Sequence, residues 1–567
     1  MIDLTSKPFN LDEAGAAWVR ATLAGMDLRA KVGQLFCLIG MTSDEAALKG
    51  VLDGFKPGGV MYRAAPGAEV RKAHAFLQDN SELPLLVAAN LEAGGDGIAT
   101  DGTSYGNQMQ VAATDDEETA YRLGLVAGRE GAAVGCNWAF APVIDIDYNF
   151  QNPITNTRTY GSDPERVLRM AKACMRGIHE CGLAVSIKHF PGDGVDSRDQ
   201  HLLPSSNDLS AEDWDASYGM VYRGMIEAGA ATVMSAHITQ PAYTRKLRPG
   251  TADGDVMPAS LAPELLGGLL RKELGFKGLV TTDATIMAGF TQAGDRSRLV
   301  PLSIAAGNDM FLFTQDLAED FGFMMAGVES GILSPERLDE AVTRVLALKA
   351  SLRLHEKQKS GTLVPPESAL AVLGCAEHRA WARECADKSV TLVKDGQGLL
   401  PLSPAKHRRI KLFVLGDRAG LFGGAEGSSK RFVRLLEARG FEVSVADTSK
   451  PDLAALFRPV KSIKDECDLV LYYANLKTAS NQTTVRIEWA PPMGLDLPRY
   501  LGEAPVAFVS VANPYHLLDV PRVKTFVNAY GDGPDSVAAV VEKLVGASPF
   551  VGKSPVDPFC GRWDARL

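Results

Sequence analysis

Apolar and polar positions follow two different rhythms over residues 1–351. Short apolar runs of strand length are separated by segments in which apolar residues recur at helical spacing. Because repeated strand–helix units of this kind close into a barrel, we predict a TIM-like (β/α)8 barrel over residues 1–351. The predicted strands are QLFCLI (34–39), GGVMY (58–62), PLLVAAN (84–90), NWAFAPVID (137–145), LAVSIKH (183–189), ATVMSAHI (231–238), GLVTTDA (278–284) and GNDMFLF (307–313).

The stretch GSDPERVLRMAKACMRGIHECG shows the helical rhythm most clearly. Pro164 suits a first helical turn, apolar residues then recur at helical spacing, and Gly182 favours the end of the helix. A second helix is predicted over residues 261–274, with Ser260 as its N-terminal cap.

The pattern changes after the predicted barrel. Residues 352–370 are polar with Gly and Pro, and we interpret them as a linker. Apolar runs and amphipathic segments then alternate again, so we predict a three-layer α/β/α sandwich domain over residues 371–567. Its predicted strands cover 410–416, 441–447, 468–475 and 505–513, and its predicted helices cover 428–440 and 536–546.

The composition argues against some classes of binding partner. Hydrophobic residues make up 46% of the 567 residues, and the net charge of −10 argues against nucleic acid and anionic membranes as partners. The eight cysteines are scattered, the N-terminus lacks a basic start followed by an apolar run, and no apolar run approaches the roughly 20 residues of a membrane helix. We therefore expect a soluble, cytoplasmic protein with no membrane partner.

A glycine-rich turn follows the predicted strand 410–416. The stretch VLGDRAGLFGGAEG (414–427) lacks the G-x-G-x-x-G spacing of a dinucleotide-binding loop. We therefore expect no cofactor.

Polar residues gather where the predicted barrel strands end. In a parallel barrel these ends form one rim, and active sites lie there. Buried apolar strands give no structural reason for polar residues to gather at their ends, so we expect a functional site at this rim. The residues are Asn90, Asp145, Lys188, His189, His237 and Asp283. We expect a structural role for Asp145 and a hydrogen-bonded core position for His237.

The loop SIKHFPGDGVDSRDQHLLP (186–204) carries the richest chemistry. The Pro and Gly between its histidines and aspartates argue against two ligands facing a metal together, and no common metal spacing is present, so we expect no metal. In an extended stretch Asp199 lies on the same face as His201, where its carboxylate can hold and polarise the imidazole. A histidine held in this way can act as a general acid and base.

Such an acid needs a nucleophile, and Asp283 at the end of an apolar strand is the candidate. A retaining glycosidase pairs a nucleophilic carboxylate with a second group that protonates the leaving oxygen, which would be His201 here. A structural capping role for a lone buried Asp is an equal alternative on this logic alone.

Three segments resemble glycoside hydrolase family 3, in its β-N-acetylglucosaminidase branch. They are KHFPGDGVDSRDQH (188–201), PASLAPELLGGLLRKELGFKGLVTTDA (258–284) and NPITNTRTYGSDPERV (152–167). The resemblance implies Asp283 as nucleophile and Asp199–His201 as the acid/base dyad. It also implies that Arg158, Lys188 and His189 contact the sugar.

The resemblance continues into the second domain and departs from the family in two places. SVTLVKDGQGLLPL (389–402) and PVAFVSVANPYHLLDVPRVKTFVNAYGD (505–532) are similar to two-domain members. Asn90 stands where the family usually has a sugar-binding Asp, so hydroxyl recognition is expected to persist in altered form. Asp193 replaces a loop histidine and changes the local charge.

The resemblance implies a retaining exo-glycosidase that removes terminal β-linked N-acetylglucosamine through a covalent glycosyl-Asp intermediate. Its expected partner is a small carbohydrate, an amino-sugar glycoside such as a muropeptide or chitooligosaccharide, with phosphate as a further acceptor. The alternatives are a family 3 β-glucosidase, an N-acetylglucosaminide phosphorylase, and a catalytically silent amino-sugar-binding protein.

Overall fold

The computed structural model describes residues 2–417, 427–447, 454, 457–491, 493–499 and 501–567. Most of the glycine-rich stretch 414–427 therefore lies outside the described residues. The described chain forms two compact units. The first comprises Met1–Tyr105, Ala120–Thr155 and Pro164–Arg379, and the second comprises Gly106–Thr119, Asn156–Asp163 and Ala380–Leu567.

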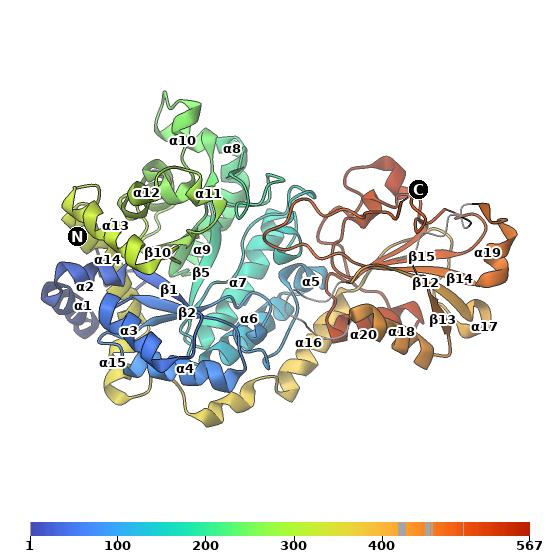
Figure 1. Ribbon diagram of the computed structural model, residues 1–567, viewed down its shortest axis with the longest axis horizontal. Helices are drawn as coiled ribbons and strands as arrows, with labels where there is room; N and C mark the ends of the chain where they lie inside the picture. The colour runs from blue at the N-terminus through green and yellow to red at the C-terminus, as the bar shows by residue number, and fades with distance from the viewer. Residues whose placement is uncertain (1, 418–426, 448–453, 455–456, 492, 500) are drawn as a thin grey trace. The chain divides into compact units, whose positions relative to one another are not determined.

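The first unit contains a closed barrel of eight parallel strands, which confirms the predicted fold (Figure 1). Every predicted strand of the first 351 residues overlaps one barrel strand. The order around the barrel is β1-β10-β9-β7-β5-β4-β3-β2. The strands are β1 (Phe36–Gly40), β2 (Gly59–Tyr62), β3 (Leu86–Ala89), β4 (Trp138–Ala139), β5 (Ala184–Phe190), β7 (Thr232–Ser235), β9 (Leu279–Ala284) and β10 (Met310–Leu312).

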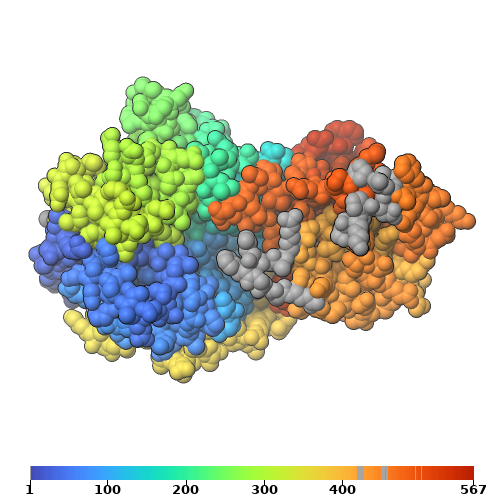
Figure 2. Space-filling model, viewed as in Figure 1, coloured from blue at the N-terminus to red at the C-terminus, as the bar shows by residue number. Residues whose placement is uncertain are grey.

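Helices cover the outside of the barrel because their apolar faces need a buried partner. The predicted helix forms as α7 (Pro164–Glu180), and Val167, Ala171 and Ile178 are among its buried residues. Gly182 adopts a φ of +78°, a left-handed conformation that favours glycine after a helix. In the space-filling view the N-terminal residues in blue adjoin yellow-green residues near 300–330, as expected where β1 pairs with β10 (Figure 2).

The predicted capping role of Ser260 is wrong. Ser260 lies in a short 3-10 turn, η5 (Ala259–Leu261), and the following helix η6 begins only at Glu264 and ends at Glu273. The Ser260 hydroxyl is instead hydrogen-bonded to Nδ1 of His237 at 2.8 Å. A buried imidazole, which must find partners, therefore takes the hydroxyl that local sequence assigned to the helix.

The second unit is built on a six-stranded sheet with the order β11-β16-β15-β14-β12-β13. All pairings are parallel except β11 with β16. Helices α18 (Ser428–Ala438) and α20 (Pro534–Leu544) contribute to the hydrophobic core on one face, as predicted. The strands are β11 (Thr391–Asp395), β12 (Arg409–Gly416), β13 (Glu442–Val445), β14 (Leu469–Asn475), β15 (Val506–Ser510) and β16 (Thr525–Asn528).

The other face of this sheet carries a column of stacked aromatic rings. Tyr472 stacks on Phe413 at 4.9 Å and on Phe508 at 5.6 Å, and Phe526 continues the column at 5.1 Å from Phe508. Each ring comes from a neighbouring strand, so the column follows the parallel register of the sheet. The sequence patterns identified β12, β13, β14 and β15, and they missed β11 at one edge of the sheet and β16 beside it.

The predicted linker is ordered along much of its length. It contains α15 (Leu354–Ser360), Gln358 donates to the carbonyl of Ser81 at 3.0 Å, and Arg71 donates to the carbonyl of Pro365 at 2.7 Å. These contacts hold the segment against the barrel unit. The domain limits 1–351, 352–370 and 371–567 stay a prediction.

Among the described residues, no helix combines the length and apolarity needed to span a membrane. All eight cysteines are free thiols, and five of them are buried. A cytoplasmic location stays a prediction.

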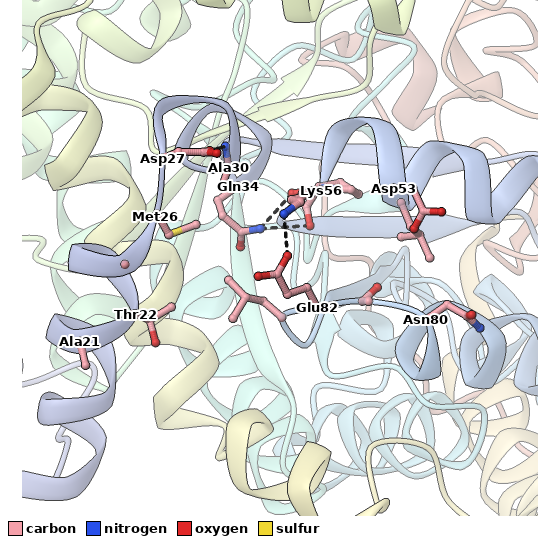
Figure 3. A pocket seen from close by; sticks show the side chains of 15 residues that line it. Ala21, Thr22, Met26, Asp27, Ala30, Gln34, Asp53, Lys56, Asn80 and Glu82 are labelled. Atoms are coloured by element: carbon pink, nitrogen blue, oxygen red, sulfur yellow. Dashed lines mark hydrogen bonds and ion pairs between the residues drawn. The ribbon is translucent and has the colours of Figure 1, made fainter.

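A cavity of about 450 Å³ opens at the end of the barrel where the strands begin (Figure 3). Gln34, which ends α2 (Leu28–Gln34), lines it and donates to the carbonyl of Lys56 at 2.9 Å. Behind Gln34, the fully buried Lys349 of α14 (Pro335–Ser351) donates to Gln34 Oε1 at 2.5 Å. Burial lowers the pKa of Lys349 to about 7.

Replacing Lys349 with methionine is expected to change how stability depends on pH. From pH 7 to about 10.5 the unfolded state binds a proton that the folded state lacks, so wild-type stability falls as the pH falls. The Lys349→Met variant lacks this loss, and its melting temperature relative to wild type should rise as the pH falls from 10 to 7. Thermal unfolding at several pH values measures the difference, with exposed Lys49→Met as control. A difference independent of pH would contradict the buried-amine interpretation.

Candidate active site

The parallel barrel brings the polar strand ends together at one rim. Lys188 and His189 lie near the end of β5, Asp283 near the end of β9, and Asn90 directly after β3. All carboxyl ends of the barrel strands face the same way, so these side chains belong to one end of the barrel. The 450 Å³ cavity lies at the opposite end.

Lys188 is held between two residues that follow β3. Its ammonium forms an ion pair with Glu92 Oε1 at 2.7 Å and donates to Asn90 Oδ1 at 3.4 Å. The Lys188 side chain is only 3% exposed, so Glu92 compensates a charge that burial would otherwise penalise. Sequence reasoning missed Glu92, although it lies two residues after Asn90 and shares its face in extended backbone.

His189 is paired with Asp145, which follows β4. The imidazole Nδ1 lies 2.6 Å from Asp145 Oδ2, while Asp145 Oδ1 accepts from the backbone N–H groups of His189 at 3.1 Å and Asp193 at 2.8 Å. The carboxylate accepts at Nδ1, which directs the other ring nitrogen, Nε2, away from Asp145. Asp145 therefore has a specific task in orienting His189, beyond the structural role expected for it.

A second Asp–His pair lies in the loop after β5. His201 Nδ1 lies 2.7 Å from Asp199 Oδ1, and the same oxygen accepts from the His201 backbone N–H at 2.9 Å. The Asp199 side chain is fully buried, whereas the imidazole is 24% exposed. His201 thus presents Nε2 to a space that solvent or a ligand can reach.

Gln200 ties this loop to the strand that carries Asp283. Its amide donates to Asp283 Oδ2 at 3.2 Å, and its carbonyl oxygen accepts from the His237 backbone N–H at 2.7 Å. The Ala288 N–H donates to the carbonyl of His201 at 3.1 Å. The loop after β5 and the loop after β9 are therefore fastened together beside Asp283. Sequence reasoning missed Gln200, whose one signal was its place between Asp199 and His201.

Asp283 is an ionised carboxylate despite being nearly buried. Burial acts to raise its pKa, but the nearby imidazoles, His189 foremost, and the Ala284 N–H at 2.7 Å hold the pKa below its ordinary value. An anion at this position is available to attack an electrophilic carbon.

His237 is a neutral, hydrogen-bonded core residue, in line with the expectation for it. Burial lowers its pKa to about 4. Its Nδ1 contacts the Ser260 hydroxyl, and its Nε2 lies 3.1 Å from the carbonyl of Ala284.

Asp193 lies in the same loop as the two pairs and is fully surrounded by protein. Burial and the adjacent charge of Asp145 raise its pKa well above the ordinary value. Its Oδ1 accepts from Asn152 at 2.9 Å and from the Gly194 N–H at 2.7 Å, while its Oδ2 is buried without a hydrogen-bond partner. The raised pKa of Asp193 favours its protonated form, which limits the negative charge beside Asp145.

Arg158 is the one predicted site residue that lies outside the barrel unit. Its segment, Asn156–Asp163, groups with the second unit, where Asn156 donates to Asn513 at 3.4 Å. The other predicted residues all belong to the barrel unit, and Asn90, Lys188, His189, Asp199, His201 and Asp283 share the site described above. No cluster of three or more His, Cys, Asp or Glu suited to a metal ion occurs among the residues that the structure describes.

Comparison with known proteins identifies the class of protein. Residues 27–348 match the family model described as the glycosyl hydrolase family 3 N terminal domain. The chain belongs to glycoside hydrolase family 3, and it is a glycosidase acting on β-glycosides.

The similarity to known proteins extends over the whole chain. The sequence is 50% identical over 569 residues, covering all of both chains, to a Cellulomonas fimi protein named β-N-acetylglucosaminidase/β-glucosidase. A solved structure titled β-glucoside phosphorylase BglX shares 47% identity over 99% of each chain, with a TM-score of 0.93. The structure of a family 3 β-N-acetylglucosaminidase from Paenibacillus sp. str. FPU-7 is 25% identical over 94% of this chain and 99% of that one, with a TM-score of 0.78.

Replacing Asp193 with asparagine is expected to stabilise the protein increasingly as the pH rises. Above the unfolded pKa near 3.8, folded wild type must keep a proton that the unfolded chain releases, so wild-type stability falls with rising pH. Asparagine keeps the Oδ1 acceptor and needs no proton. The melting temperature of Asp193→Asn minus that of wild type should therefore grow from pH 4 to pH 7. Exposed Asp253→Asn is the control, and a difference that stays constant or shrinks as the pH rises would contradict a raised pKa for Asp193.

Proposed function

We propose that this protein is a retaining exo-glycosidase that removes terminal β-linked N-acetylglucosamine by double displacement. The observation that carries the proposal is the ionised carboxylate of Asp283, fastened through Gln200 to the loop of the Asp199–His201 pair. A nucleophile and a proton donor on adjoining loops are the two groups that a retaining mechanism requires.

In the first step, Asp283 attacks the anomeric carbon and the glycosidic C–O bond breaks. His201 in its protonated form donates the Nε2 proton to the departing oxygen, because Nδ1 is engaged by Asp199. The products are a covalent glycosyl-Asp283 ester, a neutral His201 and the free aglycone alcohol.

In the second step, water attacks the anomeric carbon of the ester. Neutral His201 takes a proton from the water at Nε2, the ester bond breaks, and Asp283 returns as a carboxylate. The buried Asp199 stabilises the imidazolium each time it forms, which is the task of the carboxylate in a Ser-His-Asp triad.

The sugar is recognised at its hydroxyl groups by the polar strand ends. We propose that Asn90, Lys188 and His189 bind the ring, with Glu92 and Asp145 orienting the last two, and that Arg158 adds a further contact. Asn90 offers an amide donor where an aspartate would only accept, so tolerance of more than one glycone is expected. The Cellulomonas fimi relative, named for both N-acetylglucosaminidase and glucosidase activity, supports dual use of β-N-acetylglucosaminides and β-glucosides. A muropeptide or chitooligosaccharide would supply the natural amino-sugar glycoside.

Azide chemistry separates the two proposed roles. Asp283→Gly and His201→Ala should each lower kcat on 4-nitrophenyl N-acetyl-β-D-glucosaminide by about 10²–10⁴-fold. With added azide, Asp283→Gly should form the α-glycosyl azide, because azide takes the place of the lost nucleophile. His201→Ala should form the β-glycosyl azide, because azide attacks the ester that still forms.

The product anomer is read by NMR, and His179→Ala on the outer helix α7 serves as a matched histidine control that retains activity. Near-normal turnover in either variant would contradict the assignment. Binding of the glycoside by wild type without product release would favour the catalytically silent alternative.

Phosphate is a second candidate acceptor. A histidine base is uncharged when it activates the acceptor, so the phosphate dianion meets no carboxylate repulsion at that position. The likeness to the structure titled β-glucoside phosphorylase BglX supports this candidate. Turnover of the aryl glycoside in phosphate buffer should yield a sugar 1-phosphate alongside or in place of the free sugar. Exclusive release of free sugar at saturating phosphate would restrict the enzyme to hydrolysis.

A further inference from the structure

Large apolar side chains are exposed at the same end of the barrel as Asp283. They lie at or just after the ends of strands β1 and β9, or in the loop after β5. More than a third of each residue's surface is exposed. We call them the apolar arc: Ile39, Met41, Leu202, Leu203 and Ile286.

Ile39 faces the barrel interior. Phe36 stacks at 5.8 Å on Phe321 of α13 (Leu317–Glu329), which lies outside the barrel, so Cys37 and Ile39 point inward by strand alternation. Cys37 is fully buried deeper in the barrel, whereas Ile39 is 43% exposed at the strand end. The mouth of the barrel is therefore lined in part by an aliphatic side chain open to solvent.

Leu202 and Leu203 directly follow the proposed acid. Both donate their backbone N–H groups to the carbonyl of Asp199, at 3.0 and 2.9 Å, so they are fixed relative to the Asp199–His201 pair. Ile286 lies three residues after Asp283, on the loop whose Ala288 N–H contacts His201. These apolar residues flank the junction between the proposed proton donor and nucleophile.

The polar residues of the mouth occupy a different sector from Ile39 and Ile286, while Leu202 and Leu203 lie in the loop after β5. Asn90 and Glu92 follow β3 and Lys188 lies on β5, whereas Ile39 lies on β1 and Ile286 follows β9, and only β10 separates β1 from β9. With the sugar's hydroxyls bound to the polar sector and its leaving oxygen protonated by His201, as proposed above, the aglycone lies beside the loop that carries Leu202 and Leu203. Aliphatic side chains offer no hydrogen bonds to a hydrated sugar aglycone, but they gain free energy when an apolar aglycone covers them.

We propose that the apolar arc is the aglycone subsite, and that the preferred substrates are β-glycosides with an aryl or alkyl aglycone. This inference rests on the proposed function and chooses among the aglycones that it leaves open.

The test measures inhibition by two non-hydrolysable thioglycosides, octyl and methyl 1-thio-N-acetyl-β-D-glucosaminide. Their inhibition constants differ only through the aglycone. Each fully buried CH₂ group favours binding about fourfold, so the octyl compound should bind wild type at least about tenfold more tightly than the methyl compound. The double variant Leu203→Ser, Ile286→Ser should lose most of this ratio, and Ile39→Thr should reduce it.

Two controls separate this inference from the proposed function. β-N-Acetylglucosaminyl azide carries no bulky aglycone, so its hydrolysis should stay within about twofold of wild type in every variant. Ile332→Ser, at an exposed isoleucine in the turn between α13 and α14, should leave the octyl-to-methyl ratio unchanged.

Three outcomes decide the matter. No turnover of the azide by wild type would overturn the proposed function itself. Turnover of the azide with equal inhibition by the octyl and methyl compounds would overturn the apolar subsite alone. Variants that change the oligomeric state in solution, with the inhibition ratio intact, would assign the arc to contacts between copies of this chain and also overturn the proposal.

Discussion

The proposed chemistry of this protein depends on keeping one nearly buried carboxylate ionised. Asp283 lies on an apolar barrel strand, where burial alone would favour its protonated, inert form. The surrounding imidazoles and the Ala284 N–H reverse that effect, and Gln200 holds one carboxylate oxygen. The barrel rim provides this environment because it collects side chains from several strands around one point.

The site contains two Asp–His pairs whose surroundings suit them to different roles. Asp145 follows β4 and pairs with His189 of β5, whereas Asp199 and His201 both lie in the loop after β5. The imidazole of His189 is almost enclosed and paired with Asp145, whereas that of His201 is partly open and paired with Asp199. Enclosure suits a residue that holds a sugar in one orientation, and exposure suits one that exchanges protons with an incoming acceptor. The raised pKa of Asp193 favours its protonated form, so Asp145 supplies the carboxylate charge that contacts His189 Nδ1.

The mouth of the barrel combines two kinds of surface. Charged and amide groups from β3 and β5 match a sugar's hydroxyls, while the apolar arc beside His201 matches a leaving group without them. Specificity for the glycone would thus be set by residues at the ends of β3 and β5, and specificity for the aglycone by the loop after β5 together with residues of β1 and the loop after β9. The neutral Asn90 at the polar sector is consistent with a site that accepts more than one sugar.

The sequence by itself determined the eight barrel strands and their polar ends, because strand period and burial are local properties of the chain. It also placed Asp199 and His201 together, since their spacing of two residues decides their common face. Only the tertiary structure decided which distant side chains contact each other. Gln200 donates to Asp283, 83 residues away in the sequence, and His189 contacts Asp145, 44 residues away. It likewise moved Ser260 from its expected cap to His237 and grouped Arg158 with the second unit. Such choices depend on which strands become neighbours when the barrel closes, and no local pattern encodes that order.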